Sequence, residues 1–438
     1  MEKVLGRDEG VLEKLFKLNE RGSNVKQEII GGVTTFLTMS YIIFVHPSIL
    51  SSTGMDKGAL ITVTCLSAAI GTLISALWAN APFALAPGMG LNAFFTYTLV
   101  LGEGITWEDA LGVVFMSGVF FFLMAIGGIR EKIANCIPAS LKIAVTAGIG
   151  LFISFIGLQS MGLVVASPAT LVTMGEFSTP VVLGVIGLII AAILEIRQVK
   201  GGILIGIVAA TVLGIMFGEV ILPKTLVSMP PSIAPIAFKL NILGALKISL
   251  MGPIFSFMFV DLFDSLGTLI ACAREIGLEN KEGKIEGLGK MLHSDVISTV
   301  IGALLGTSTV TTLSESAAGI AAGARTGLAS VITASLFLVA LLFTPLVGAV
   351  PAFATSPALI IVGVYMFKNI REIDFTDFKI AIPSFITILM MPLTYSISVG
   401  LSFGFVAYVV VHAGTGEFDK INPTLWFIGA LSFVNLIV

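Results

Sequence analysis

Long apolar runs with few polar interruptions recur along the whole chain of 438 residues. A helix needs about 20 mainly apolar residues to cross the hydrocarbon core of a bilayer. By this rule the pattern predicts about fourteen spans, some of them short or broken: 29–50, 58–79, 83–101, 108–128, 140–165, 179–197, 201–222, 246–272, 287–306, 308–324, 326–349, 355–368, 377–393 and 395–413. The last apolar piece, 422–438, is either an interfacial helix or an additional span.

Composition supports the same class of protein. Only 12% of the residues are charged, about half of the roughly 25% found in soluble domains. An all-α polytopic membrane protein is therefore expected, because helices satisfy their own backbone hydrogen-bonding groups in lipid. Its expected partner is the lipid bilayer, and no nucleic-acid binding is predicted. The three cysteines are isolated and the three histidines are scattered, so neither a metal site nor a cofactor is predicted.

The distribution of positive charge orients the spans. With a cytoplasmic N-terminus, 20 of the 24 lysines and arginines fall in segments on the cytoplasmic side. This is the positive-inside pattern, and a shift by one span would destroy it. The sequence thus predicts a multi-pass protein of the cell (inner) membrane, with residues 1–28 as a cytoplasmic segment.

Two interrupted spans occupy corresponding places in the two halves of the chain. Seven spans followed by seven put the halves in opposite orientation, because seven is odd. The third span carries Ala86-Pro87-Gly88-Met89-Gly90, and the tenth is the Ser-, Thr- and Gly-rich segment 306–324. Paired breaks in an inverted repeat are typical of transporter binding sites. Small residues that permit close helix packing are the simpler alternative.

Each break is expected to start a half-helix inside the membrane. An extended stretch from Phe83 to Pro87 followed by a helix from about Gly90 would leave backbone N–H groups free at the new helix start. Thr309, Thr311 and Thr312 would lead into a second start before Glu315. Two opposed helix starts near the midplane make a polar pocket.

Four carboxylates lie inside predicted spans: Asp261, Asp264, Asp295 and Glu315. Intramembrane acids are costly and usually functional. They fit ion or proton coupling, or recognition of a ligand with adjacent N–H donors, since a carboxylate accepts two parallel hydrogen bonds. Nearby aromatic residues that would hold a planar ring are Phe94, Phe95 and Phe263. A plain helix-packing role remains open for Asp295.

Four segments carry a resemblance to a known family: "EIIGGVTTFLTMSYIIFVHPSILSSTGMD" (28–56), "APFALAPGMGLNAFFTYTLV" (81–100), "FVDLFDSLGTL" (259–269) and "TSTVTTLSESAAGIAAGARTGLASV" (307–331). Together they resemble the AzgA-like branch of the nucleobase–cation symporter-2 family, whose members are permeases for adenine, guanine and hypoxanthine. The resemblance extends over essentially the whole chain.

The resemblance implies a fourteen-span, seven-plus-seven inverted repeat in which the third and tenth spans combine a short extended strand with a helix. It implies a core domain (29–128 and 246–349) that moves against a gate domain (129–245 and 350–413), followed by a C-terminal apolar segment (414–438).

The resemblance also implies roles for individual residues. Asn92, Asp261 and Glu315 would contact the purine, Asp264 would serve proton coupling, and Asp295 would support the site and the coupling. Thr34 and Thr35 match a polar pair of the first span. The full set of expected substrate contacts is Asn92, Asp261, Glu315, Thr35, Phe94, Phe263 and Ser316.

The resulting hypothesis is a transporter, not an enzyme, that imports a purine with protons by an elevator-like motion. Aspartates in the eighth span and Ser316 after Glu315 favour the purine branch over the xanthine/uracil branch. The sequence leaves open which purine is preferred, whether Na⁺ replaces H⁺, and whether the chain forms a homodimer. An anion transporter of the same architecture is the alternative, although it would need a cation where this chain has Glu315. An intramembrane aspartyl protease is disfavoured, because its YD and GxGD motifs are missing.

Overall fold

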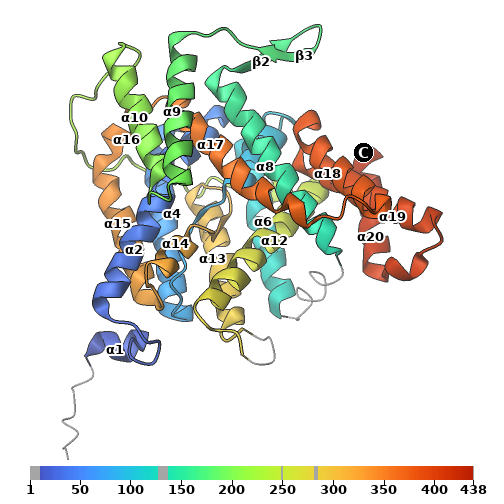
Figure 1. Cartoon of the computed structure of the whole chain (residues 1–438), viewed down its shortest axis with the longest axis horizontal. Coiled ribbons are helices and arrows are strands. Elements are labelled where there is room, and N and C mark those ends of the chain that lie inside the picture. Colours follow the sequence, from blue (N-terminus) through green and yellow to red (C-terminus); the bar gives the residue numbers. More distant parts are fainter. Residues whose placement is uncertain (1–9, 127–136, 248–249, 281–284, 438) are drawn as a thin grey trace, which may run out of the picture.

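The chain is described by a computed structural model that covers residues 10–126, 137–247, 250–280 and 285–437, without the side chains of Ala125, Ile126 and Phe263. It is mostly helical (Figure 1). The elements of the first half are α1 (Val11–Phe16), α2 (Val25–Met39), α3 (Ile42–Leu50), η1 (Ser51–Thr53), α4 (Lys57–Ile74), η2 (Ser75–Ala79), β1 (Leu85–Pro87), α5 (Met89–Ala93), η3 (Phe94–Val100), α6 (Trp107–Ile126), α8 (Ala139–Met161), β2 (Val164–Ser167), β3 (Leu171–Met174), α9 (Thr179–Ile196) and α10 (Gly202–Met216).

The second half repeats the scheme with its own short strand. Its elements are α11 (Ile242–Ala245), α12 (Met251–Glu275), α13 (Leu288–Leu305), β4 (Val310–Thr312), α14 (Ser316–Ala321), α15 (Gly327–Ala340), η5 (Leu341–Phe343), α16 (Thr344–Ala349), α17 (Ala352–Phe367), η6 (Lys368–Glu372), α18 (Phe378–Thr394), α19 (Ile397–Gly414), η7 (Phe418–Lys420) and α20 (Pro423–Ile437).

The helices coincide with the predicted spans. Each of the fourteen predicted segments overlaps at least one of these helices. Within the described ranges, ten helical stretches are long and apolar enough to cross a bilayer by length and composition, and shorter apolar helices accompany them. The first span is one such stretch, Val25–Thr53, which starts four residues before its predicted beginning. Helix α20 occupies the last apolar piece, whose place in or on the membrane stays a prediction.

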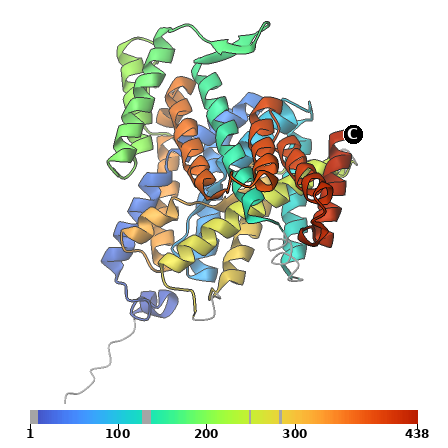
Figure 2. The same ribbon diagram turned by 45° about the vertical axis from the view of Figure 1, so that its right-hand side comes forward.

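The molecule has two distinct ends and an apolar circumference. Helix α1 lies at one end and the β2–β3 hairpin projects from the other, while α9–α10 and α19–α20 form opposite flanks (Figures 1 and 2). Large apolar side chains on these flanking helices are exposed, among them Ile189 (51%), Val212 (48%) and Val410 (62%). Such a belt is costly in water and is what a lipid-facing surface requires.

Helices of each predicted domain pack among themselves. Helix α2 lies against α14 and α15, and α8 lies against α17 and α18. At the α2–α14 contact, a Cβ atom on Gly319 would come within 1.9 Å of the Thr35 hydroxyl oxygen. Glycine thus lets the two backbones approach closely. The division into core and gate domains stays a prediction.

The two broken spans meet as a two-stranded antiparallel ribbon. Strands β1 and β4 pair Leu85 with Thr312, Ala86 with Thr311 and Pro87 with Val310. The predicted extended stretch is confirmed, with its paired part at Leu85–Pro87, and the predicted helix start is confirmed to within one residue, since α5 begins at Met89. The hydrogen bond from Gly88 N to Thr309 O (3.2 Å) flanks the ribbon. In this register Pro87 stands in a non-hydrogen-bonded pair, so its missing N–H costs no ladder bond.

Side chains of neighbouring helices satisfy the outward-facing backbone groups of this buried ribbon. The Thr72 hydroxyl on α4 accepts from Leu85 N (2.9 Å) and donates to Leu85 O (3.1 Å). On the other edge, Asp295 Oδ1 on α13 accepts from Thr312 N (2.7 Å), and the Thr299 hydroxyl donates to Val310 O (3.0 Å). A bare sheet edge is not tolerated at membrane depth, so these residues make the ribbon possible.

Asp295 also joins the ribbon to α12. Its Oδ2 atom accepts from the Ser265 hydroxyl (2.5 Å), which in turn lies 2.7 Å from the Thr311 hydroxyl. The Thr312 hydroxyl donates to Oδ1 (2.9 Å). A fully buried carboxylate thus accepts three hydrogen bonds and fixes strand β4 between α12 and α13.

Replacing Asp295 by alanine should destabilise the protein strongly, by about 3 kcal/mol, because it leaves the Thr312 N–H and two hydroxyl groups buried without their acceptor. Asp295→Asn keeps the volume and one carbonyl acceptor, so most of the stability should remain. Thermal unfolding of the purified variants in detergent measures both. Equal midpoints for Asp295→Ala and the unmodified chain would contradict a bracing role.

Candidate functional site

The ribbon places two helix starts at its opposite ends in the interior, because the antiparallel register sets Pro87 beside Val310 and Thr312 beside Leu85. Helix α5 begins directly after β1 and continues into η3, a seven-residue π-helix. Helix α14 begins four residues after β4, with Glu315 as its N-cap residue. π-Helical turns are rare and often occur at functional sites. The structure thus has the expected second helix start, which follows the threonines of β4 and is capped by Glu315.

Glu315 is held by a tyrosine of the first span. Tyr41, in the short break between α2 and α3, donates its phenolic O–H to Glu315 Oε1 (2.6 Å), and Ser314 donates to Oε2 (3.3 Å). Glu315 remains partly exposed, whereas Tyr41 is buried. Tyr41 could not be singled out from the sequence. Its signal was an aromatic hydroxyl group inside a predicted span, one of five tyrosines in the chain.

Asp264 lines a small cavity between the two predicted domains. Gly90 and Leu91 of α5, Thr146 of α8 and Met366 of α17 share this cavity with it. The cavity volume is about 10 Å³, room for one water at most. The Asp264 carboxyl group also interacts electrostatically with Asp295 and Glu315. Three of the four predicted acids therefore belong to one neighbourhood.

The fourth acid, Asp261, lies one helical turn before Asp264 on α12 and is buried. The predicted i, i+3 arrangement on one helix is thus present. Within the described ranges, no three His, Cys, Asp or Glu side chains come together as a metal site. What the acids offer instead is a set of hydrogen-bond acceptors beside two helix starts.

Asn92 and Ser316 connect the two broken spans. Asn92 is fully buried; its Oδ1 atom accepts from the Ser308 hydroxyl, and its Nδ2 atom lies 3.8 Å from the sulfur of Met89. The Ser316 hydroxyl accepts from Ala84 N (3.0 Å). Both residues belong to the predicted substrate contacts, and both cross from one half of the repeat to the other.

The remaining predicted contacts are spread around the ribbon. Phe94 is buried and packs on Phe257 of α12, with 4.6 Å between the ring centroids. Thr35 is buried where α2 meets α14, and the neighbouring Thr34 hydroxyl accepts from Lys200 Nζ (3.4 Å). The side chain of Phe263 lies outside the described residues. The substrate and coupling roles of the whole set stay predictions.

His46 forms a further link that the sequence did not reveal. Its Nδ1 atom lies 2.7 Å from the Thr64 hydroxyl and its Nε2 atom 2.8 Å from the Thr307 hydroxyl. Thr64 donates its single hydroxyl proton to Leu60 O (2.6 Å), so it must accept from Nδ1–H. A hydroxyl group has one proton to give. His46 is therefore protonated on Nδ1 and joins α3, α4 and the chain that leads into β4.

Comparison with known proteins places this geometry in a family. A family model described as a permease family matches residues 26–403. A putative permease of Methanocaldococcus jannaschii is 49% identical over 97% of this chain and 98% of its own length. Adenine permease AdeP of Escherichia coli is 42% identical over 98% and 96%. Guanine/hypoxanthine permease PbuG of Bacillus subtilis is 43% identical over 95% and 97%.

A solved structure shares the fold at much lower identity. The transmembrane domain of the cyanobacterial bicarbonate transporter BicA superposes with a TM-score of 0.65 at 18% identity, covering 88% of this chain and 97% of that one. The fold is thus that of the seven-plus-seven inverted-repeat transporters. The permease-family match and the permease relatives along the whole chain make the protein a multi-pass membrane permease and not an enzyme. With full-length relatives at this level of identity and its own pair of broken spans, the chain belongs to the nucleobase–cation symporter-2 family of permeases.

Proposed function

We propose that the protein imports purine nucleobases together with protons, with Glu315 as the central substrate contact. The observation that supports this proposal most is the position of this carboxylate. Glu315 caps the start of α14 beside the ribbon and accepts a hydrogen bond from Tyr41 of the first span. Relatives along the whole chain are named adenine and guanine/hypoxanthine permeases. The purine bases named for these relatives carry N–H donors, which the carboxylates of the site can accept.

A purine offers the hydrogen-bond donors that these acids accept. Glu315 and Asp261 would accept from ring N–H or amino groups, and paired acceptance by one carboxylate gives both energy and orientation. Asn92 Nδ2 contacts the sulfur of Met89, a weak acceptor, and would exchange this contact for a purine acceptor. Tyr41 occupies Glu315 Oε1 and would yield that oxygen to the arriving base.

Proton coupling would act through Asp264. This carboxyl group faces the cavity between α5, α8 and α17, with Asp295 and Glu315 as electrostatic neighbours. Moving a charged carboxylate with the core through a low-dielectric seam is costly, and protonation removes that cost. Asp295 would support this group by holding β4 against α12.

An elevator-like motion of the core against the gate fits the position of the site. The Asp264 cavity has walls from α5 and α12 on one side and from α8 and α17 on the other. We further propose that the N-terminus is cytoplasmic and that the protein works in the cell membrane, as the lysine and arginine distribution indicates. A homodimer would suit such a motion, because a fixed partner can anchor the gate.

Anion transport is the competing function, because BicA, a bicarbonate transporter, shares the fold. Fold alone does not determine substrate. The described residues that line the Asp264 cavity include a carboxylate and no lysine or arginine, an arrangement that repels anions.

Uptake of radiolabelled hypoxanthine, guanine, adenine, xanthine, uracil and sulfate into proteoliposomes tests this proposal. The three purine-branch substrates should accumulate and compete with one another, whereas sulfate should not. In the Glu315→Gln variant, purine affinity should fall by about tenfold or more, because a charge-assisted hydrogen bond worth about 1.5–3 kcal/mol is lost. Sulfate uptake, or undiminished purine affinity in Glu315→Gln, would contradict it.

Asp264→Asn should separate transport from coupling. The neutral amide cannot bind and release the coupling proton, so uptake should no longer rise with an inward proton gradient. Exchange of labelled for unlabelled purine across the membrane should persist, because that half-cycle needs no net proton movement. A matched Na⁺ gradient in place of the proton gradient serves as the control. If uptake by Asp264→Asn still rose fully with the proton gradient, Asp264 would not be the coupling residue.

A further inference from the structure

A second and larger cavity lies on the same seam, nearer the end of the molecule that carries the β2–β3 hairpin. Its volume is about 190 Å³, nearly twenty times that of the Asp264 cavity. Ser160 reaches it one residue before the end of α8, from which the chain continues into the hairpin. Under the proposed orientation this is the outer face.

The two cavities share the same pair of gate helices. Helix α8 contributes Ile149 to the inner cavity and Ser160 to the outer one, about 16 Å apart at 1.5 Å per residue. Helix α17 contributes Met366 and Leu359 in the same way, about 10 Å apart. Phe152, between these positions on α8, is buried and packs against the Tyr395 ring, with 5.4 Å between the ring centroids. The same two gate helices therefore line both cavities at successive positions.

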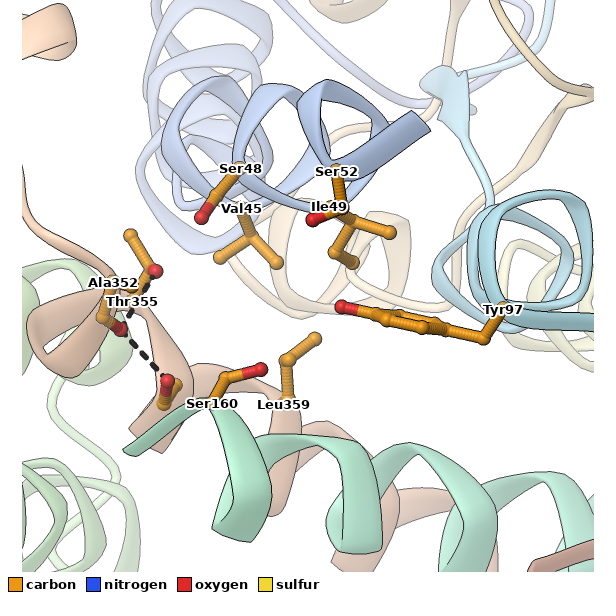
Figure 3. Close-up of a pocket in the computed structure, with 10 residues that line it drawn as sticks. Val45, Ser48, Ile49, Ser52, Tyr97, Ser160, Ala352, Thr355 and Leu359 are labelled. Carbon is orange, nitrogen blue, oxygen red and sulfur yellow. Dashed lines mark hydrogen bonds between the residues drawn. The ribbon is translucent and has the colours of Figure 1, made fainter. Parts of the chain in front are cut away.

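Hydroxyl groups dominate the polar lining of the outer cavity. In Figure 3 the Tyr97 ring reaches into the space from η3, and the Ser160 hydroxyl points into it from α8. Thr355 and Ser356 donate their protons to Ala352 O (3.1 and 2.7 Å), so their oxygens face a solute as acceptors. The six hydroxyl-bearing residues are Ser48, Ser52, Tyr97, Ser160, Thr355 and Ser356.

This lining selects for an uncharged, planar, polar solute. The ten described lining residues include no Lys, Arg, His, Asp or Glu, so an ion would lose hydration without gaining an opposite charge. Hydroxyl groups both donate and accept, which matches the mixed edge of a heteroaromatic base. Ile49, Leu359 and the Tyr97 ring supply apolar walls for its faces.

We propose that this cavity is an outer subsite that binds an uncharged purine base before the base reaches Glu315. The inference rests on the proposed function, purine import, and adds a binding site to it. Because the outer subsite is built from neutral hydroxyl groups, its affinity is independent of the Glu315 carboxylate. The Tyr97 helix links the two sites, since Tyr97 lies five residues after Asn92 on the continuous α5–η3 helix.

Protection of an introduced thiol tests the subsite. Ser160→Cys is placed in a full-length chain from which Cys65, Cys136 and Cys272 have been removed, and its reaction with a small maleimide is timed with and without hypoxanthine or adenine. Bound base should slow labelling in proportion to 1 + [ligand]/Kd, reaching about tenfold at ten times the Kd. The same protection should appear in the Glu315→Gln background, because the two sites bind separately.

Two further variants control the experiment. Thr225→Cys, on an exposed loop that does not line the cavity, should label equally fast with and without base. Ser52→Cys gives a second probe of the same cavity if Ser160→Cys does not fold. Absence of protection at both positions, or protection that disappears with Glu315→Gln, would overturn the subsite. Purine uptake by the unmodified chain is scored in parallel, so that failure of the subsite and failure of purine import are told apart.

Discussion

The structure depends on one constraint: backbone N–H and C=O groups that leave a helix inside a membrane must find other partners. The chain breaks its helices twice at depth, and the two breaks satisfy each other by pairing β1 with β4. A two-stranded ribbon still has two outer edges. Thr72 covers one edge, and Asp295 with Thr299 covers groups of the other. A costly local feature thus becomes stable only through residues of both halves of the repeat.

The same partners carry the geometry of the site. Ser265 links Asp295 and Thr311, and it directly follows Asp264 on α12. Movement of β4 would therefore shift the acids of α12 and Glu315 together. Asn92 and Ser316 add cross-links beyond the two ends of the ribbon. In the proposed elevator-like motion, these links would carry the acids of the site together as one unit.

Much of this arrangement could be predicted from the sequence, because breaks and acids are rare in apolar spans. Pro87 and the Thr-rich segment before Glu315 stand out against their surroundings, and their matched places in two inverted halves indicate a pair. The bracing residues could not be predicted. Thr72, Thr299 and His46 are ordinary side chains in helices, and their partners lie elsewhere in the chain or in another element.

The sequence also could not show which partner each buried polar residue binds. Asn92 attracted attention as an amide in an apolar span, and in the fold it accepts from Ser308 across the repeat. Tyr41, by contrast, escaped notice although it holds Glu315. Both partners are more than 200 residues away. Contacts between residues so far apart in the sequence become visible only in the fold. The cost of burying a polar group, by contrast, can be inferred from the sequence alone.

The proposed site depends on the two broken spans pairing in this register in the interior of the protein. Cysteine cross-linking tests this pairing in a chain from which the native cysteines have been removed. Ala86→Cys with Thr311→Cys should form a disulfide on mild oxidation, since directly opposed residues of an antiparallel pair lie within disulfide reach. Ala86→Cys with Val310→Cys, whose side chains point to opposite faces, should not. Equal cross-linking of both pairs, or none in the first, would contradict the account.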